Sequence, residues 1–241
     1  MKVLKQVLGI DVAKDELVVS LGKLLEDLSI DIREYQVFNN NEKGFRHLLQ
    51  WVYDKKSEQT NVVFVMEATG VYHEKFAYFL HSKEEKVAIV LPNKISNFMR
   101  TLDIKTVTDK TCSIGIAQFG LGRELQECQP SSIIYKELQQ LSREKNQVIN
   151  ERVVCMNQLH AEQAQALPNL KTIKRLNERI LLLQGQEKEI KADMLDKVEK
   201  DKDARESVKL MSSIPGVGKV TAISVLAETN GFELISNKKQ L

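Results

Sequence analysis

The amino-acid sequence predicts an α/β domain, followed by a long α-helical coiled-coil arm and a partial helical C-terminal domain. Three observations predict this order. Short β-branched runs alternate with helix-like segments over residues 1–129. Glu, Lys, Gln and Leu replace the glycines and β-branched residues over residues 130–207. A Pro-Gly turn and a short helical run then begin the segment 208–241.

Three strands are expected at the start of the first domain, at residues 7–12, 17–21 and 30–38. The first two flank a short turn. A helix over residues 41–55 should follow, because three consecutive asparagines supply helix-start chemistry and apolar side chains recur at helical spacing. These apolar residues are Phe45, Leu48, Leu49 and Val52.

The same alternation continues through the rest of the first domain. Compact apolar runs predict buried strands at residues 62–66 and 87–91, with a helix over residues 73–82 between them. Pro92 is expected to end the second of these strands. Thr108 has the chemistry of an N-cap and predicts a further helix.

The predicted arm consists of two helices separated at Pro168-Asn169. The first helix carries apolar residues at steps of three or four: Ile149, Val153, Met156 and Leu159. The second carries a heptad stripe with Glu187 at one seam position: Ile173, Leu176, Ile180, Leu183, Ile190 and Met194. Such narrow stripes require the helices to pair as a hairpin or with another subunit. The alternative is a helical bundle packed on the first domain.

Composition excludes several classes of protein. The net charge of +2 comes from 35 basic and 33 acidic residues, so any nucleic-acid contact depends on local basic clusters. No apolar run is long enough to span a membrane, and Asp11 interrupts the first one, which favours a cytoplasmic protein. Cys112, Cys128 and Cys155 are widely spaced and have the pattern of reduced thiols, not of a zinc site.

Two acids end predicted strands. Asp11 closes the first apolar strand and Glu67 closes the strand at residues 62–66. If these strands are parallel neighbours, their carboxyl ends bring both acids to one edge of the sheet. Paired carboxylates repel each other unless a cation neutralises them, and oxygen ligands suit Mg²⁺ or Mn²⁺. The alternative is that each acid simply caps the helix that follows it.

Four segments, in this order along the chain, resemble the successive motifs of a known family. They are Gly9-Ile10-Asp11-Val12-Ala13-Lys14, Glu67-Ala68-Thr69-Gly70-Val71-Tyr72, Pro92-Asn93-Lys94 and Lys105-Thr106-Val107-Thr108-Asp109-Lys110. The family is that of the DEDD transposases, the insertion-sequence family numbered 110, in its 1111-like branch. Residues 214–222 resemble the start of the family's C-terminal transposase domain.

The resemblance implies a ribonuclease H-like first domain, similar to the RuvC Holliday-junction resolvases, in which four acids bind Mg²⁺. Asp11, Glu67 and Asp109 match the first three acids, which makes them the expected catalytic and metal-binding residues. The position of the fourth acid, three residues after the third, is Cys112. A thiol is a poor ligand for Mg²⁺, so the metal site is expected to be weakened or altered. Ser113 and Asp103 are the nearby candidates to compensate.

The activity implied by the resemblance is DNA transposition or recombination by metal-dependent phosphoryl transfer. The family also uses a serine nucleophile in the C-terminal domain. The serines of the last segment lie before its expected place, so none is assigned and the chain is expected to be a truncated transposase: Ser212, Ser213, Ser224 and Ser236. DNA, a structured guide RNA and further copies of the chain, joined through the arm, are the implied partners.

Basic and glycine residues supply the candidate nucleic-acid contacts. Four cations surround the third acid, and the sequence around Pro215 resembles the turn of a helix-hairpin-helix, whose backbone N–H groups hold a DNA phosphate. The candidates are Lys94, Arg100, Lys105, Lys110, Gly216, Gly218 and Lys219. A solvated surface and a simple interhelical turn are the competing interpretations.

Two other functions compete with the active transposase. Cys112 and the missing serine favour a decayed, non-catalytic protein that binds nucleic acid and oligomerises. Gly9-Ile10-Asp11 also resembles the first motif of actin-like ATPases and sugar kinases. Those proteins need further glycine-rich phosphate loops and a second α/β lobe, whereas a helical arm occupies that part of this sequence.

Overall fold

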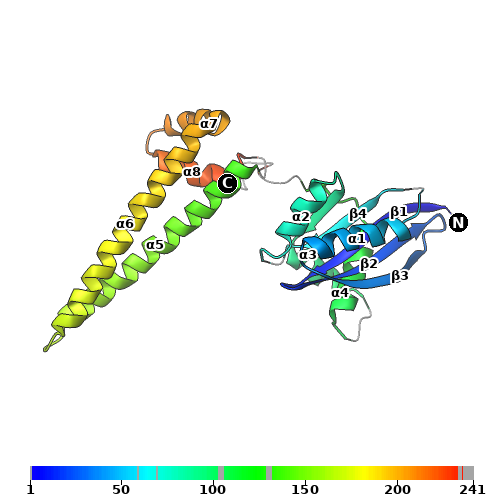
Figure 1. Ribbon diagram of the computed structural model, residues 1–241, viewed down its shortest axis with the longest axis horizontal. Coiled ribbons are helices and arrows are strands. Elements are labelled where there is room, and N and C mark those ends of the chain that lie inside the picture. The colour runs from blue at the N-terminus through cyan, green and yellow to red at the C-terminus, as the bar shows by residue number, and fades with distance from the viewer. Residues whose placement is uncertain are drawn as a thin grey trace. The chain divides into compact units, whose positions relative to one another are not determined.

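The computed structural model describes residues 2–58, 60–68, 70–102, 106–128, 132–232 and 235. The chain divides into two compact units, Met1–Pro130 and Ser131–Leu241. The first unit contains a β-sheet with its helices, and the second contains two long paired helices with two shorter ones (Figure 1).

The first unit is built on a mixed five-stranded sheet. Its strands are β1 (Val3–Val12), β2 (Glu16–Leu25), β3 (Ile30–Asn39), β4 (Val62–Glu67) and β5 (Lys86–Val90). The spatial order is β3-β2-β1-β4-β5. The β1–β2 and β2–β3 pairs are antiparallel, and the β1–β4 and β4–β5 pairs are parallel. This combination of order and direction is that of the predicted ribonuclease H-like fold. The five predicted strands are confirmed, and the first two extend further than expected.

Four helices of the first unit are α1 (Glu42–Lys55), α2 (Glu74–His81), α3 (Pro92–Met99) and α4 (Asp109–Leu121). The predicted start of α1 is confirmed, because the Asn41 side chain accepts a hydrogen bond from the Gly44 N–H at 2.9 Å. Helix α3 was not expected. Pro92 ends the preceding strand as predicted, but it also occupies the first turn of α3, where its missing N–H costs nothing.

The two faces of the sheet carry separate cores. Alternate side chains of β1 and β4 pack with α1 and α2 on one face, where Leu8, Ile10 and Met66 are fully buried. The other alternate set packs with α3 and α4 and includes Val7 and Val65. Helix α1 therefore covers one face of the sheet, and α4 covers the other (Figure 1).

Gly9 fixes how closely α4 approaches the sheet. A Cβ atom at Gly9 would lie 2.2 Å from the Ser113 carbonyl oxygen and 2.3 Å from the Ala117 nitrogen. Only glycine allows the backbone of α4 to lie this close to β1. The glycine two residues before Asp11 therefore sets the position of the helix that begins with Asp109.

The second unit contains α5 (Ile133–Gln163), α6 (Leu170–Lys200), α7 (Lys202–Ser212) and α8 (Lys219–Glu228). Helices α5 and α6 pair along their length, and α7 and α8 pack into the same core at one end. Leu138 of α5 is buried there with Ile223 and Leu226 of α8. Helices α5 and α6 thus form a hairpin, which is one of the pairings that the sequence left open. Pairing of the arm with another subunit stays a prediction.

The predicted apolar stripes of the two arm helices differ in how well they match the observed burial. The α6 stripe is confirmed, since Leu176, Leu183, Ile190 and Met194 are buried. The α5 stripe is wrong at Val153 and Met156, which are 47% and 46% exposed, whereas its other two residues, Ile149 and Leu159, are half-buried. The side of α5 that meets α6 instead carries Leu138, Ser142, Lys145, Val148, Arg152 and Cys155. Polar residues on this side form bonds across the unit, so apolar spacing alone selects the wrong face of α5. Within the described residues, no helix is long and apolar enough to cross a membrane.

Candidate active site

Strand register brings Asp11 and Glu67 together. Parallel strands β1 and β4 pair with Ile10 opposite Met66, so the next residues, Asp11 and Glu67, lie side by side where the two strands end. Neighbouring strands lie about 4.8 Å apart. Asp11 is two residues after Gly9, which touches α4, so strand alternation directs its side chain to the α4 face. The prediction that both acids meet at one sheet edge is confirmed.

Asp109 is the first residue of α4, and two features fix its place. Thr108 caps the helix: its Oγ1 accepts from the Thr111 N–H at 3.2 Å, and the Thr111 Oγ1 accepts from the Thr108 N–H at 2.7 Å. The fully buried Ser113 hydroxyl lies 2.8 Å from the Ser20 hydroxyl of β2. The predicted cap is confirmed. Ser113 is engaged by the sheet, so it is no substitute for the fourth acid, and Asp103 lies outside the described residues.

The pKa values of the site show that its acids interact. The pKa of Asp11 is raised to about 6, first by burial, then by the negative charges of Asp109 and Glu67, against a hydrogen bond from the Val12 N–H that lowers it. Burial raises the pKa of the Cys112 thiol, and the charges of Asp11, Asp109 and Glu67 raise it further. Cys112 therefore lies within the field of all three acids, and its thiol is protonated at neutral pH.

A cleft of about 800 Å³ opens beside these residues, and we call it the acidic cleft. Asp11, Glu67 and Cys112 line one side of it. Residues of α3 and the loop after it line the other: Pro92, Asn93, Ile95, Ser96, Met99, Arg100, Leu102 and Val107. The cleft thus combines carboxylates with a guanidinium and small polar side chains, which suits an anionic substrate held near a cation.

The carboxylates of Asp11, Glu67 and Asp109 are suitable ligands for a divalent metal ion. Three carboxylates repel one another at this edge, and a bound cation would relieve the repulsion that raises the pKa of Asp11. Carboxylate oxygens are the ligands of Mg²⁺ and similar hard cations. Among the described residues, no three His, Cys, Asp or Glu side chains are already gathered closely enough to hold an ion. Occupation therefore requires the side chains to converge.

The predicted basic cluster is divided by the fold. Arg100 lines the acidic cleft, but Lys94 lines a different cavity on the far side of α3. The Lys110 ammonium lies 4.8 Å from the centre of the Tyr35 ring, beside β3. Lys105 lies outside the described residues. Asn93 and Ser96 were not expected in the cleft because α3 itself was not expected. The available sequence signal for α3 was Pro92, since proline is common in the first turn of a helix.

The predicted glycine turn lies in the second unit, between α7 and α8. Gly216 has φ of +89°, which confirms that a glycine is needed there. Gly218 has φ of −78° and precedes α8, and no side chain caps this helix. A Cβ at either glycine would meet nothing within 4 Å. The backbone around the start of α8, next to Lys219, is therefore open to a ligand.

A family model described as Transposase, DEDD_Tnp_IS110, matches residues 8–168. This match covers more than half of the 241 residues and takes in the whole acidic cleft. The chain therefore belongs to the DEDD transposase family of the IS110 type.

Similar proteins include two pilin gene-inverting proteins. The pilin gene-inverting protein of Moraxella bovis is 31% identical over 152 residues, and that of Moraxella lacunata is 32% identical over 154. Each match covers 61% of this chain and 45% of the relative, so the chain spans about half the length of these proteins.

Solved structures give only distant likenesses. RuvC of T. thermophilus, in complex with a Holliday junction substrate, is 10% identical with a TM-score of 0.36, over 48% of this chain and 97% of that one. The yeast mitochondrial Holliday junction resolvase is 15% identical with a TM-score of 0.37, over 48% and 79%. The assignment of the fold rests on the strand order given above.

Proposed function

We propose that this chain carries the metal-binding site of an insertion-sequence DNA transposase or recombinase, which transfers phosphoryl groups on DNA. Asp11, Glu67 and Asp109 are the proposed metal ligands and catalytic residues. The observation that carries the proposal is the parallel register that sets Asp11 beside Glu67, with Asp109 close enough to raise the pKa of Asp11. The ion is Mg²⁺ or Mn²⁺.

Each residue of the acidic cleft has a separate proposed role. A bound divalent ion would neutralise charge on a phosphate oxygen and help to activate the attacking oxygen. Asp11 and Glu67 hold the ion at the strand ends, and Asp109 approaches from α4. Arg100 also lines the cleft, and its guanidinium would pair with a DNA phosphate and orient it. Asn93 and Ser96 offer further hydrogen bonds to the sugar-phosphate backbone.

Cys112 distinguishes this site from the family pattern. A protonated thiol replaces a fourth negative charge, which reduces both the repulsion among the acids and the attraction for a cation. We infer a site that still binds a divalent ion but does so weakly. The same substitution favours the second candidate function, a non-catalytic protein that binds nucleic acid and oligomerises through the arm.

The proposed nucleophile is a serine of the family's C-terminal domain, and we assign it to none of Ser212, Ser213 or Ser224. Ser224 is held by the second unit, with its hydroxyl 2.9 Å from that of Ser142 and 3.1 Å from the Lys145 ammonium. Ser236 lies outside the described residues. DNA, a structured guide RNA and a second copy of the chain are the proposed partners. Lys219 and the open backbone at the start of α8 support a phosphate contact.

Metal-dependent stabilisation tests the proposal directly. A ligand that binds only the folded chain increases its unfolding free energy by RT ln(1 + [L]/Kd), and the melting temperature rises as a result. We expect Mn²⁺ and Mg²⁺ to raise the melting temperature of the chain, and Asp11→Asn and Glu67→Gln to abolish this rise. Asp15→Asn, an exposed acid in the β1–β2 turn, is the matched control and should keep it. An equal response in all four proteins would exclude the acidic cleft as the metal site and would favour the non-catalytic function.

A further inference from the structure

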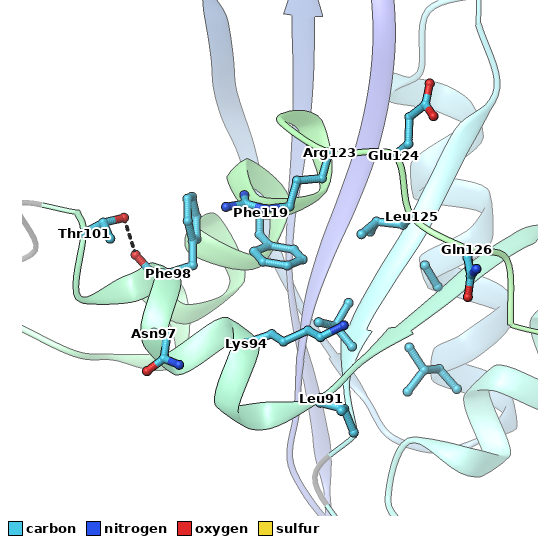
Figure 2. Close-up of a pocket in the computed structure, with 13 residues that line it drawn as sticks. Leu91, Lys94, Asn97, Phe98, Thr101, Phe119, Arg123, Glu124, Leu125 and Gln126 are labelled. Atoms are coloured by element: carbon cyan, nitrogen blue, oxygen red, sulfur yellow. Dashed lines mark hydrogen bonds between the residues drawn. The ribbon is translucent and has the colours of Figure 1, made fainter. Parts of the chain in front are cut away.

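The first unit contains a second cavity, of about 930 Å³, which we call the α3–α4 cavity. It lies between α3, the end of α4, strand β5 and the segment that follows α4 (Figure 2). The side chains that face it are labelled in Figure 2: Leu91, Lys94, Asn97, Phe98, Thr101, Phe119, Arg123, Glu124, Leu125 and Gln126. The acidic site uses none of them.

An aromatic pair with a cation forms one wall of this cavity. The rings of Phe98 and Phe119 meet edge to face, with centroids 5.4 Å apart. The Arg123 guanidinium carbon lies 4.3 Å from the centre of the Phe119 ring and 4.7 Å from that of Phe98. In the described part of the chain, no carboxylate lies within ion-pair distance of Arg123. Stacking on the rings leaves its N–H edges available to an anion.

The remaining walls supply a second cation and amide groups. The Lys94 side chain extends from α3 beneath the Phe119 ring, and its ammonium points into the cavity (Figure 2). Asn97 and Gln126 bring amides from opposite sides, and Leu91 adds apolar surface that is 56% exposed. Phe119 is 5% exposed and Arg123 lies over both phenylalanine rings, so the flat surface open to a ligand is the exposed Arg123 guanidinium. A planar cation, a lysine ammonium and amides within one cavity match the parts of a nucleotide: the flat base, its phosphate and its polar edge.

Helix α3 separates this cavity from the acidic cleft. Asn93, Ser96 and Arg100 face the cleft, whereas Lys94 and Asn97 face the cavity. An α-helix with its side chains is about 10 Å across. A DNA strand advances about 3.4 Å per nucleotide in a duplex, so about three nucleotides span α3. One strand can therefore place its backbone in the cleft and a nearby base in the cavity.

We propose that the α3–α4 cavity binds an unpaired nucleotide of the DNA strand whose backbone lies in the acidic cleft. The inference rests on the proposed function for the identity of that strand. The base stacks on the exposed Arg123 guanidinium, which the Phe98 and Phe119 rings support from behind, Lys94 holds its phosphate, and Asn97 and Gln126 meet its polar edge. The nucleotide must be unpaired, because a base inside a duplex offers no free face or pairing edge to such walls.

Binding of a single-stranded DNA oligonucleotide with one 2-aminopurine, scanned along its length, tests the proposal. We expect the probe's fluorescence to change on binding at one position, and Lys94→Gln and Arg123→Ala each to abolish this change and weaken binding about tenfold. Arg46→Gln and Lys75→Gln are the matched controls, since these cations line a groove between α1 and α2 on the other face of the sheet. Lys94 is exposed, so Lys94→Gln keeps the fold even if Arg123→Ala does not.

Three further measurements separate the possible outcomes. An abasic site at the responsive position should weaken binding by as much as Lys94→Gln does. Asp11→Asn should keep the 2-aminopurine response, so failure of the metal site and failure of the cavity are distinguishable. Equal losses in Lys94→Gln and the control variants would overturn the proposal, as would tighter binding of the matching RNA strand through the same residues.

Discussion

Two half-buried carboxylates, Asp11 in the acidic cleft and Glu187 in the arm, meet opposite surroundings. Glu187 accepts a hydrogen bond from the Lys191 ammonium at 2.5 Å and lies 3.1 Å from the Arg152 guanidinium; Lys191 first, and then Arg152, lower its pKa. Burial raises the pKa of Asp11 to about 6, together with the negative charges of Asp109 and Glu67. Among the described residues, Glu187 forms ion pairs with Lys191 and Arg152, whereas no cation lies within ion-pair distance of Asp11.

The difference teaches how to separate a structural carboxylate from a functional one. An acid that serves the fold has its charge balanced by side chains of the same unit, as Glu187 has. An acid such as Asp11, whose pKa is raised by burial and by neighbouring acids, costs stability when it ionises, and a bound cation would relieve that cost. The acidic cleft and the seam between α5 and α6 should therefore respond in opposite ways to mutation, pH and added cations.

Gly9→Ala should have the largest effect of these substitutions, because it disrupts the acidic cleft and leaves the arm intact. The new Cβ would meet the backbone of α4 at 2.2 Å, so the helix that carries Asp109 must move. We expect a loss of about 1–3 kcal/mol in the unfolding free energy of the first unit, together with loss of metal-dependent stabilisation. Chemical denaturation with and without Mn²⁺ measures both.

Gly185→Ala in α6 is the matched control for Gly9→Ala. A Cβ at Gly185 would meet nothing within 4 Å, and alanine favours a helix interior by about 0.5–1 kcal/mol. This substitution should stabilise the second unit and leave metal binding unchanged. Equal effects of the two substitutions would contradict the role given to Gly9.

Cys112→Asp should sharpen the contrast by adding a fourth acid to the cleft. Without a cation the extra charge increases repulsion from Asp11, Asp109 and Glu67, so the melting temperature should fall. With a cation, the affinity for Mg²⁺ should rise on the order of tenfold, the effect that even outer partners of metal ligands have. Cys112→Ser, which adds no charge, should do neither. Calorimetric titration of Mg²⁺ compares the three proteins.

Glu187→Gln should remove the carboxylate that balances two cations in the arm. The substitution leaves Arg152 and Lys191 facing each other without their shared anion, and we expect a loss of about 1 kcal/mol in the unfolding free energy. Glu178→Gln, at an exposed pair with Lys174 on the same helix, should cost less. Urea denaturation measures both, and a neutral effect of Glu187→Gln would show that the seam does not depend on its ion pairs.

The dependence of stability on pH should differ in sign between the two acids. Because the pKa of Asp11 is higher in the folded state than in the unfolded state, ionisation of Asp11 lowers the unfolding free energy of the chain. This loss of stability develops as pH rises from about 4 to above 6. The folded pKa of Glu187 is lowered, so its stabilisation is present at neutral pH and is lost as pH falls into the acid range. Without metal, the unfolding free energy of Asp11→Asn should fall with rising pH by on the order of 1 kcal/mol less than that of the unchanged chain. The difference is this small because Asp11 is partly solvated.

Local signals were sufficient to predict much of the fold. Asn41 and Thr108 cap helices as expected, because side-chain capping depends on neighbours in sequence. Asp11 and Glu67 were found because each ends a buried apolar strand, which is visible in the sequence. The first domain also matched a known order of motifs, and this order carried the assignment of Asp109.

What was missed depends on contacts between distant residues. The buried side of α5 carries Lys145 and Arg152, whose partners come from other helices, so apolar spacing favoured the exposed Val153 instead. The α3–α4 cavity could not be predicted either. Arg123 follows α4 and stacks on Phe98 of α3, and that contact exists only after both helices pack on the sheet.

The shared field of the three acids is tested most directly by the pKa of the Asp11 carboxyl itself, followed by carbon NMR as pH changes. Without divalent cations this pKa should be about 6, it should fall in Glu67→Gln, and it should fall further when Mg²⁺ or Mn²⁺ is added to the unchanged chain. A pKa near the ordinary 3.8 that is insensitive to Glu67 and to added metal would contradict a common metal site for these acids.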